Sequence, residues 1–415
     1  YGKILYRESF SSVKYKGLGK KLFPGPFSPY SEGAYHRAMR RSFAFLLLCL
    51  CICTSISYAE FPNTETPVKN MIIMIGDGLG FQHVASARAV LKQSLVMEAA
   101  PVKASLTTHT IDGSVTDSGA GGTALATGYK TSPYHIGLDP DGRHLVLISE
   151  AARDTGKTVG IVTTARLTDA TPAAFSGHVV HRDLEAEIAV AQMESGFDLF
   201  LGGGAHHYYS ENTSDDAPRP IDLAGEQGYM LVTNKKELDR ASQLPLLGLF
   251  AKRNLTAERY RRFLTQQPSL AQMTAKALEL LSQNEAGFFL MVEGALIDKR
   301  SHINERSSIP TEVLAFDKAV AVCVDFVKEN PDTLLIVTAD HETGGLTLLG
   351  NGKVKFTTFG HTDAPVPLFV FGRGAEAFSD ASDTTDVANI AFRLGGLRKA
   401  GQSGYSTAQP ISSLY

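Results

Sequence analysis

The chain has 415 residues, of which 43% are hydrophobic and 20% charged, with 38 Gly, 18 Pro and no Trp. This composition is that of a globular protein and excludes a disordered, collagenous or coiled-coil chain. Charge is distributed unevenly, because residues 1–41 hold nine Lys and Arg, whereas residues 60–415 hold 31 basic and 41 acidic side chains, a net charge of −10. The net negative charge of residues 60–415 argues against general nucleic-acid binding, which depends on clustered Lys and Arg.

The first segment with a clear pattern is residues 39–59, MRRSFAFLLLCLCICTSISYA. Two arginines follow its methionine, an apolar stretch of 11 residues starts at Phe43, and small residues stand at Ser57 and Ala59. This order is typical of a cleaved secretory signal peptide, and the apolar stretch is shorter than the roughly 20 residues that span a bilayer. We therefore expect residues 1–38 to be upstream sequence, the mature protein to be periplasmic or secreted, and no stable membrane anchor. An uncleaved anchor is the alternative.

From residue 60 onward, short aliphatic or β-branched runs alternate with longer amphipathic or Ala-rich segments. This alternation is typical of α/β proteins with a parallel sheet. We expect strands at residues 71–75, 158–164, 197–202, 287–292, 333–339 and 367–372. We expect helices at residues 81–91, 118–127, 184–194, 269–282 and 311–328. Residues 205–222 are predicted to be a loop, residues 223–266 show no clear pattern, and residues 60–415 are predicted to form a single domain.

Polar side chains follow several of the predicted strands, namely Asp77, Asp169, Thr171, Glu293, Asp340 and His341. Each of them alone has a structural interpretation as a turn residue, a helix N-cap or a solvated charge. In an open parallel sheet, however, ligands bind outside the carboxyl ends of the strands, where side chains from separate strands meet. Their recurrence at successive strand ends favours a common site.

The chemistry of these side chains predicts two kinds of metal site. Oxygen donors suit Mg²⁺, and the chain offers them at Asp77, Thr171 and Glu293. Mixed carboxylate and imidazole ligands suit Zn²⁺, and the chain offers them at Asp298, His302, Asp340, His341 and His361. Asp298 and His302 are four residues apart, so a helical turn places both side chains on one face. With His361 they would make a three-ligand site with one open position, which is typical of a catalytic metal.

The segment VTDSGAGGTALATGYKT, residues 115–131, predicts a helix of small residues that begins at Ser118. Backbone N–H groups and the helix dipole at such a position favour an alkoxide or an anion. Ser118 is therefore a candidate nucleophile. The alternative is a tightly packed Ala/Gly helix with Ser118 near its cap.

Seven segments in this order resemble the alkaline phosphatase family over residues 70–374: MIIMIGDGLG, VTDSGAGGTALATGYKT, TDATPAAFSGH, DLFLGGG, MVEGALIDKRSHIN, TADHETGGLTL and FGHTDAPVPLFVFG. The resemblance implies a three-layer sandwich with a central, mostly parallel sheet and helices on both faces. It also implies hydrolysis of phosphate monoesters to an alcohol and inorganic phosphate through a phosphoserine. A phosphodiesterase of the same superfamily and a catalytically inactive phosphate- or metal-binding homologue are the alternatives.

The resemblance also implies roles for individual residues. Ser118 would be the nucleophile, and Arg182 would hold the phosphate group. Two Zn²⁺ ions and one Mg²⁺ ion are implied. Their ligands would be Asp298, His302 and His361 for the first zinc, Asp77, Asp340 and His341 for the second, and Asp77, Thr171 and Glu293 for the magnesium.

Lys299 and Asp169 match the pairing of the best-known bacterial members of the family. The resemblance implies that the two side chains touch, with Lys299 near the phosphate and Asp169 ordering the magnesium's waters. An exposed helix N-cap for Asp169 and a solvated side chain for Lys299 are the alternatives. A homodimer is also implied, although only 20 residues separate His341 from His361, too few for the inserted interface domain of larger members.

Overall fold

The structure is a computed structural model that describes residues 66–210, 218–350 and 352–399. The predicted upstream segment, the predicted signal peptide and the expected mature start near Glu60 lie outside these residues. Within the described part, no helix is both long and apolar enough to cross a membrane.

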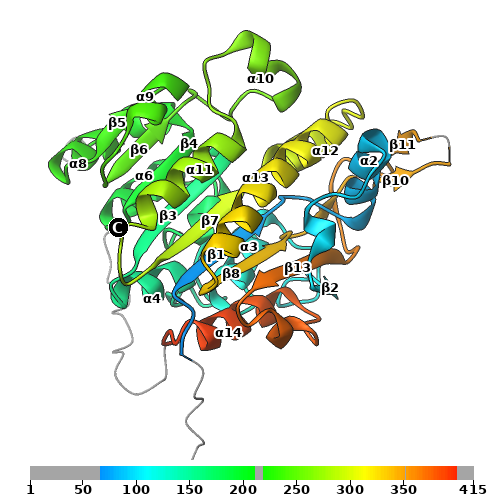
Figure 1. Cartoon of the computed structure of the whole chain (residues 1–415), viewed down its shortest axis with the longest axis horizontal. Coiled ribbons are helices and arrows are strands. Elements are labelled where there is room, and N and C mark those ends of the chain that lie inside the picture. Colours follow the sequence, from blue (N-terminus) through cyan, green and yellow to red (C-terminus); the bar gives the residue numbers. More distant parts are fainter. Residues whose placement is uncertain (1–65, 211–217, 351, 400–415) are drawn as a thin grey trace, which may run out of the picture. The chain divides into compact units, whose positions relative to one another are not determined.

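A nine-stranded sheet forms the centre of the described chain (Figure 1). Side by side, its strands are β2 (Val102–Leu106), β13 (Val366–Gly372), β8 (Thr333–Thr338), β1 (Asn70–Ile75), β7 (Phe288–Glu293), β3 (Thr158–Arg166), β4 (Leu199–Gly203), β6 (Leu246–Leu249) and β5 (Met230–Val232). β13 runs antiparallel to both of its neighbours. Every other neighbouring pair is parallel, which confirms the mostly parallel sheet.

The central strands are buried on both faces. Every residue of β1 (NMIIMI), β7 (FFLMVE) and β8 (TLLIVT) is buried. Continuous aliphatic runs of this kind are typical of parallel strands covered by helices on both sides. Near the middle of the sheet, Ile73 pairs with Met291 on one side and with Ile336 on the other.

Helices cover both faces of the sheet, which confirms the predicted three layers (Figure 1). On one face, α2 (Phe81–Leu91) and α11 (Leu270–Leu281) pack against α13 (Ile309–Glu329). On the other, α5 (Ala170–Ala174) and α14 (Thr384–Leu394) pack against α3 (Ser118–Thr127). Shorter helices connect the strands: α4 (Ile148–Asp154), α6 (Glu185–Glu194), α7 (Ala205–Tyr209), α8 (Pro220–Glu226), α9 (Lys235–Arg240), α10 (Glu258–Leu264) and α12 (Leu296–Ser301). Four two-residue strands, β9 (Glu342–Thr343), β10 (Thr347–Leu348), β11 (Val354–Lys355) and β12 (His361–Thr362), form two small ribbons.

The prediction of a loop at residues 205–222 is wrong at both ends of that range. α7 forms because Tyr208 is completely buried and its hydroxyl donates to Gln192 Oε1 at 2.6 Å. α8 begins at Pro220, whose fixed φ suits the first turn of a helix. Residues 223–266 hold β5, α9, β6 and α10, each seven residues long or fewer, too short to show a clear period in the sequence.

Candidate active site and metal ligands

The sheet register brings the predicted polar residues to one edge. Ile75, the last residue of β1, pairs with Thr338 of β8 and with Glu293 of β7. Asp77 and Asp340 each lie two residues beyond the end of their strands, β1 and β8. The carboxyl ends of adjacent parallel strands therefore hold Asp77 and Asp340 at one level and Glu293 two residues earlier, at the same edge of the sheet.

Two glycines permit the close approach that the site needs. Gly78 has a φ of +73°, and a Cβ at this position would lie 2.7 Å from Thr343 Oγ1 and 3.0 Å from Asp298 Cβ. A Cβ on Gly121 of α3 would lie 2.9 Å from the Asp340 carbonyl oxygen. Side chains at these positions would push the Asp77 turn and α3 away from the residues that follow β8.

Ser118 lies at the start of α3 and faces His341. Asp117 caps the helix, because its carboxylate accepts hydrogen bonds from Gly119 N at 2.9 Å and Ala120 N at 3.3 Å. Ser118 is 1% exposed, and its Oγ lies 3.1 Å from His341 Nε2. The predicted nucleophile is therefore held at a helix N-terminus next to an imidazole.

The hydrogen bonds around His341 determine which ring nitrogen carries its proton. The Thr343 hydroxyl donates to Asp298 Oδ1, so Thr343 Oγ1, 3.2 Å from His341 Nδ1, accepts from that nitrogen. This leaves a lone pair on Nε2, which points toward Ser118. Burial and the neighbouring His361 lower the pKa of His341, which favours the neutral ring that can bind a metal.

The first predicted group of zinc ligands comes together in the structure. His302 Nε2 lies 3.1 Å from His361 Nε2, and Asp298 Oδ1 lies 3.2 Å and 3.6 Å from these two nitrogens. His341 also reaches this group, because ligand atoms of Asp298, His341 and His361 all lie within 4.8 Å of one another. Two imidazole nitrogens and a carboxylate oxygen converging in this way have the chemistry of a zinc site.

The second predicted group lies beside the first. His341 Nε2 is 3.3 Å from Asp340 Oδ2 and 3.6 Å from Asp77 Oδ1, and ligand atoms of all three residues lie within 4.8 Å of one another. Among the described residues, Asp77 Oδ1 and Asp340 Oδ2 are buried without a hydrogen-bond partner, as are Thr171 Oγ1 and Glu293 Oε1. Buried polar atoms are rarely left unsatisfied in this way.

The electrostatics of these carboxylates also fit cations. Burial, with a contribution from Asp169, raises the pKa of Glu293 to about 8. Burial and the nearby Asp298 raise the pKa of Asp340 to about 7. Bound cations would balance the negative charge of these crowded carboxylates. The oxygen atoms that lack a hydrogen-bond partner would coordinate them. The residues present therefore fit two mixed nitrogen and oxygen sites and one oxygen site.

The expected contact between Lys299 and Asp169 is present. Lys299 Nζ lies 3.2 Å from Asp169 Oδ2, 3.4 Å from Asp298 Oδ2 and 3.7 Å from Asp77 Oδ2. Asp169 is only 4% exposed and also caps α5 through Ala170 N, so it is a helix N-cap but not an exposed one. Burial opposes the charge of Lys299, but these carboxylates outweigh it and raise the pKa of the lysine.

Arg182 is held in place by two carboxylates. Its guanidinium donates to Asp117 Oδ2 at 2.9 Å and to Asp169 Oδ1 at 3.2 Å. Asp117 was not among the predicted site residues, although its position before the helix of Ser118 was a signal for a cap. By holding Arg182 and capping α3, Asp117 links the predicted phosphate clamp to the predicted nucleophile.

A third cation beside Asp169 was also not predicted. Arg166, the last residue of β3, lies 3.3 Å from Asp169 Oδ2, and its Nε donates to Glu185 Oε2 at 2.7 Å. Burial would raise the pKa of Asp169, but Lys299, Arg166 and Arg182 outweigh it and hold that pKa well below its usual range. No sequence motif marks Arg166: Asp169 follows it by three residues, but Glu185 lies 19 residues further along the chain.

Histidines outside the two ligand groups have structural partners, as His83 and His207 show. Buried His83 bonds to Gly80 N through Nδ1 and to Ser301 Oγ through Nε2. His207 Nε2 lies 2.9 Å from Glu185 Oε2. Neither of the potential metal-ligand groups in the described part of the chain includes these residues or His135, His178, His181 and His206.

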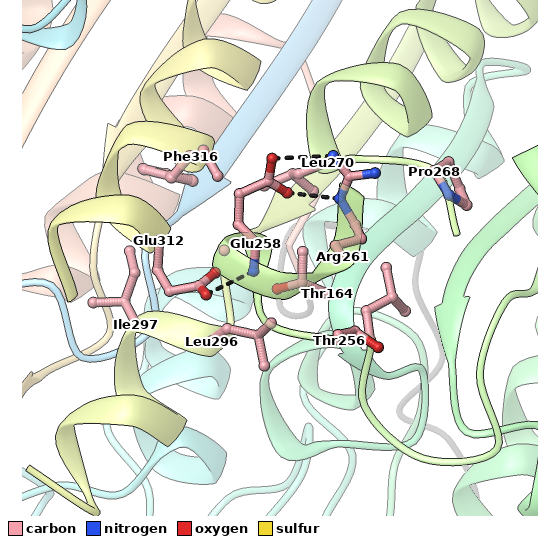
Figure 2. A pocket seen from close by; sticks show the side chains of 13 residues that line it. Thr164, Thr256, Glu258, Arg261, Pro268, Leu270, Leu296, Ile297, Glu312 and Phe316 are labelled. Atoms are coloured by element: carbon pink, nitrogen blue, oxygen red, sulfur yellow. Dashed lines mark hydrogen bonds and ion pairs between the residues drawn. The ribbon is translucent and has the colours of Figure 1, made fainter. Parts of the chain in front are cut away.

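A small cavity lies behind the site, between α10, α11 and α13 (Figure 2). Its volume is about 20 Å³, enough for roughly one water molecule. Glu312, 5% exposed, lines it and accepts a hydrogen bond from Glu258 N at 2.9 Å. Gly294 and Ile297, sequence neighbours of the metal ligands, also line the cavity, but none of the predicted site residues does.

Known proteins are similar to this chain in both sequence and fold. The alkaline phosphatase family model matches residues 68–371. The chain is 36% identical over 302 residues to alkaline phosphatase 4 of Bacillus subtilis, an alignment that covers 69% of this chain and 64% of that protein. It is 31% identical over 401 residues to the alkaline phosphatase of Escherichia coli, covering 78% of this chain and 85% of that protein.

Among solved structures, the alkaline phosphatase of the Antarctic bacterium TAB5 matches with a TM-score of 0.74 and 28% sequence identity. This match covers 80% of the present chain and 99% of the TAB5 chain. Sequence and structure together give one conclusion: the chain belongs to the alkaline phosphatase family.

Proposed function

We propose that the chain is a metal-dependent phosphomonoesterase that works through a phosphoserine at Ser118. The observation that carries the proposal is the position of Ser118 Oγ, which lies 3.1 Å from His341 Nε2 and beside two converging groups of metal ligands. Arg182 favours a monoester over a diester, because a monoester carries one more non-bridging oxygen and a larger negative charge for the guanidinium to bind.

The donor sets indicate which ion each group would hold. Asp298, His302 and His361 would hold one Zn²⁺, Asp77, Asp340 and His341 a second, and Asp77, Thr171 and Glu293 one Mg²⁺. A TAB5 alkaline phosphatase variant is described with Mg bound in the M3 site, which supports a magnesium site in this family. When bound, such ions supply positive charge that stabilises an attacking and a leaving oxygen at phosphorus.

The chain's own residues would bind and orient the ester. Arg182 donates to phosphate oxygens through its planar fork, and the hydrogen bonds from Arg182 to Asp117 and Asp169 restrict its movement. Lys299 adds a second positive charge near the phosphate. Binding through these groups recognises the phosphoryl group itself, so we expect a broad range of phosphate monoesters as substrates.

Ser118 would then carry the phosphoryl group. Its Oγ forms a bond to phosphorus while the ester P–O bond breaks, and the hydroxyl proton ends on the departing alcohol. Water next attacks the phosphoserine, breaks its O–P bond, restores the hydroxyl and releases inorganic phosphate. The start of α3 favours the negative charge that develops on the serine oxygen.

The experiment that tests this function compares the parent protein with Ser118→Ala on 4-nitrophenyl phosphate and on the matching diester. We expect the parent to prefer the monoester and the variant to lose several orders of magnitude in kcat. Phosphoenzyme trapped at low pH should carry its label on Ser118, and elemental analysis should find zinc and magnesium. Labelling of another residue, or near-normal activity in the variant, would rule out Ser118 as the nucleophile.

We also propose that residues 39–59 direct export and that the mature protein starts near Glu60. The basic start, short apolar stretch and small residues of this segment support the proposal. N-terminal sequencing of the protein purified from its host tests it. Residues 1–38 on the mature chain would contradict both the start site and the cleavage.

A further inference from the structure

A polar groove lies away from the metal ligands, between α9, α10 and the start of α11. Its volume is about 570 Å³. The charged residues that line it are Lys235, Lys236, Asp239, Arg261 and Arg262. Four cationic side chains and one carboxylate therefore face a space large enough for a ligand.

This groove is a basic region on an acidic protein. Its lining carries four Lys and Arg against one carboxylate, a net charge of +3, whereas residues 60–415 together carry −10. Two of the cations in the groove are neutralised locally, because Lys235 pairs with Asp239 and Arg261 with Glu258. Lys236 and Arg262 are exposed and form no ion pair with any described residue.

Hydrogen bonds within the protein hold the walls of the groove in place. Lys235 N donates to Gln266 O at 2.9 Å, which connects the first residue of α9 to the segment after α10. Arg261 donates to Gln267 O at 3.0 Å and holds Glu258 through two hydrogen bonds, at 2.6 and 3.0 Å. A preformed wall lowers the entropy that binding must overcome.

The groove lies at the same edge of the sheet as the candidate active site. β5 and β6 run parallel to β4, β3 and β7, and α9 begins three residues after β5 ends (Figure 1). α10 likewise follows β6, while α11 leads into β7 and so starts at this edge. β5 is four strand positions from β7. At a strand spacing of roughly 4.8 Å, β5 lies about 19 Å across the sheet from β7, the strand that carries Glu293.

We propose that this groove is a second anion-binding site, which holds further phosphate groups of a long oligophosphate whose terminal phosphate occupies the catalytic site. The proposal rests on the proposed phosphatase function and adds a substrate class to it. Lys236 and Arg262 supply positive charge that no carboxylate in the described part of the chain neutralises. A ligand with a single phosphate group cannot reach both sites, so the groove distinguishes long anionic substrates from short ones.

The test compares long-chain linear polyphosphate with 4-nitrophenyl phosphate as substrates of the holoenzyme. The variant is Lys236→Ala with Arg262→Ala, and the matched control is Lys103→Ala with Arg393→Ala, an exposed Lys and Arg outside the groove. We expect the groove variant to raise KM for polyphosphate about tenfold, since two exposed charges are lost, and to leave KM for the monoester unchanged. Added salt should weaken polyphosphate binding more in the parent than in this variant.

A second measurement separates this proposal from the proposed function. Calorimetric titration of polyphosphate into Ser118→Ala, with and without the groove substitutions, needs no turnover. A weaker Kd with the groove substitutions supports the anion site even if the parent hydrolyses no monoester. An unchanged Kd, or an equal loss in the control pair, overturns the anion site whatever the activity is.

Discussion

Glu312 offers a test of the packing behind the candidate site that is independent of the metals. Its carboxyl is 5% exposed, lines the small cavity and accepts a hydrogen bond from Glu258 N (Figure 2). Burial is the largest influence and raises the pKa of Glu312 from 4.5 to about 7. The charge of Arg300 acts in the opposite direction, and those of Glu258 and Glu305 add to the rise.

The sign of the effect on stability follows from proton binding. An acid with a higher pKa in the folded than in the unfolded protein binds protons more tightly when folded, so stability falls as pH rises between the two values. For Glu312 this window runs from 4.5 to about 7. At about 1.4 kcal/mol per pKa unit, the separation of about 2.5 units lowers the free energy of unfolding by about 3 kcal/mol above pH 7.

Glu312→Gln removes the charge and keeps a carbonyl oxygen that accepts from Glu258 N. We expect this variant to be about 3 kcal/mol more stable than the parent near pH 8 and equally stable near pH 4.5. Urea unfolding of both proteins at equal metal content measures the difference, because groups common to both proteins cancel.

Glu329→Gln, an exposed position on the same helix, is the control and should show no comparable trend with pH. A stability difference between Glu312→Gln and the parent that stays constant from pH 5 to 8 would refute the reasoning. It would mean that the Glu312 carboxyl does not titrate in this window in the folded protein.

Three further predictions concern the charges around Asp169. Lys299→Ala should raise the phosphate inhibition constant about tenfold, because a cation near the phosphate is lost; an unchanged constant would place Lys299 outside the phosphate site. Asp169→His should make activity depend on added Mg²⁺, because imidazole accepts hydrogen bonds from metal-bound water less well than a carboxylate does, and a magnesium titration measures this. Arg166→Ala should weaken phosphate inhibition a few-fold, since Asp169 would then neutralise Lys299 and Arg182 more fully, and Arg166→Lys should restore most of the loss.

The sheet and the residues at its carboxyl edge were predictable because buried parallel strands have a strong local signal. β1, β7 and β8 are continuous aliphatic runs, and each is followed by, or ends in, a carboxylate. Once the strands are parallel and adjacent, their register alone brings Asp77 and Asp340 to one level, with Glu293 two residues earlier at the same edge. The order of strands and carboxylates along the chain was therefore enough to predict that these side chains share an edge of the sheet.

The groove and its surroundings were not predictable for the opposite reason. β5, β6, α9 and α10 are between three and seven residues long, and elements of that length show no reliable period. Their positions depend on contacts far apart in sequence, such as Lys235 N with Gln266 O. Arg166 also depends on a distant contact, because its hydrogen bond to Glu185 joins β3 to α6, whereas its ion pair with Asp169 is local in the sequence.

Asp117 and Asp169 show why a structural role and a functional role were not true alternatives at this edge of the sheet. Asp117 caps α3 and holds Arg182, and Asp169 caps α5 while it contacts Arg182 and Lys299. Helices in an α/β protein begin near the carboxyl ends of the preceding strands, where the ligand also binds. A carboxylate at such a position can therefore cap its helix and hold a cation of the site at the same time, as Asp117 Oδ2 accepts from both Gly119 N and Arg182. A carboxylate that caps a helix at the carboxyl edge of the sheet is therefore also a candidate residue of the site.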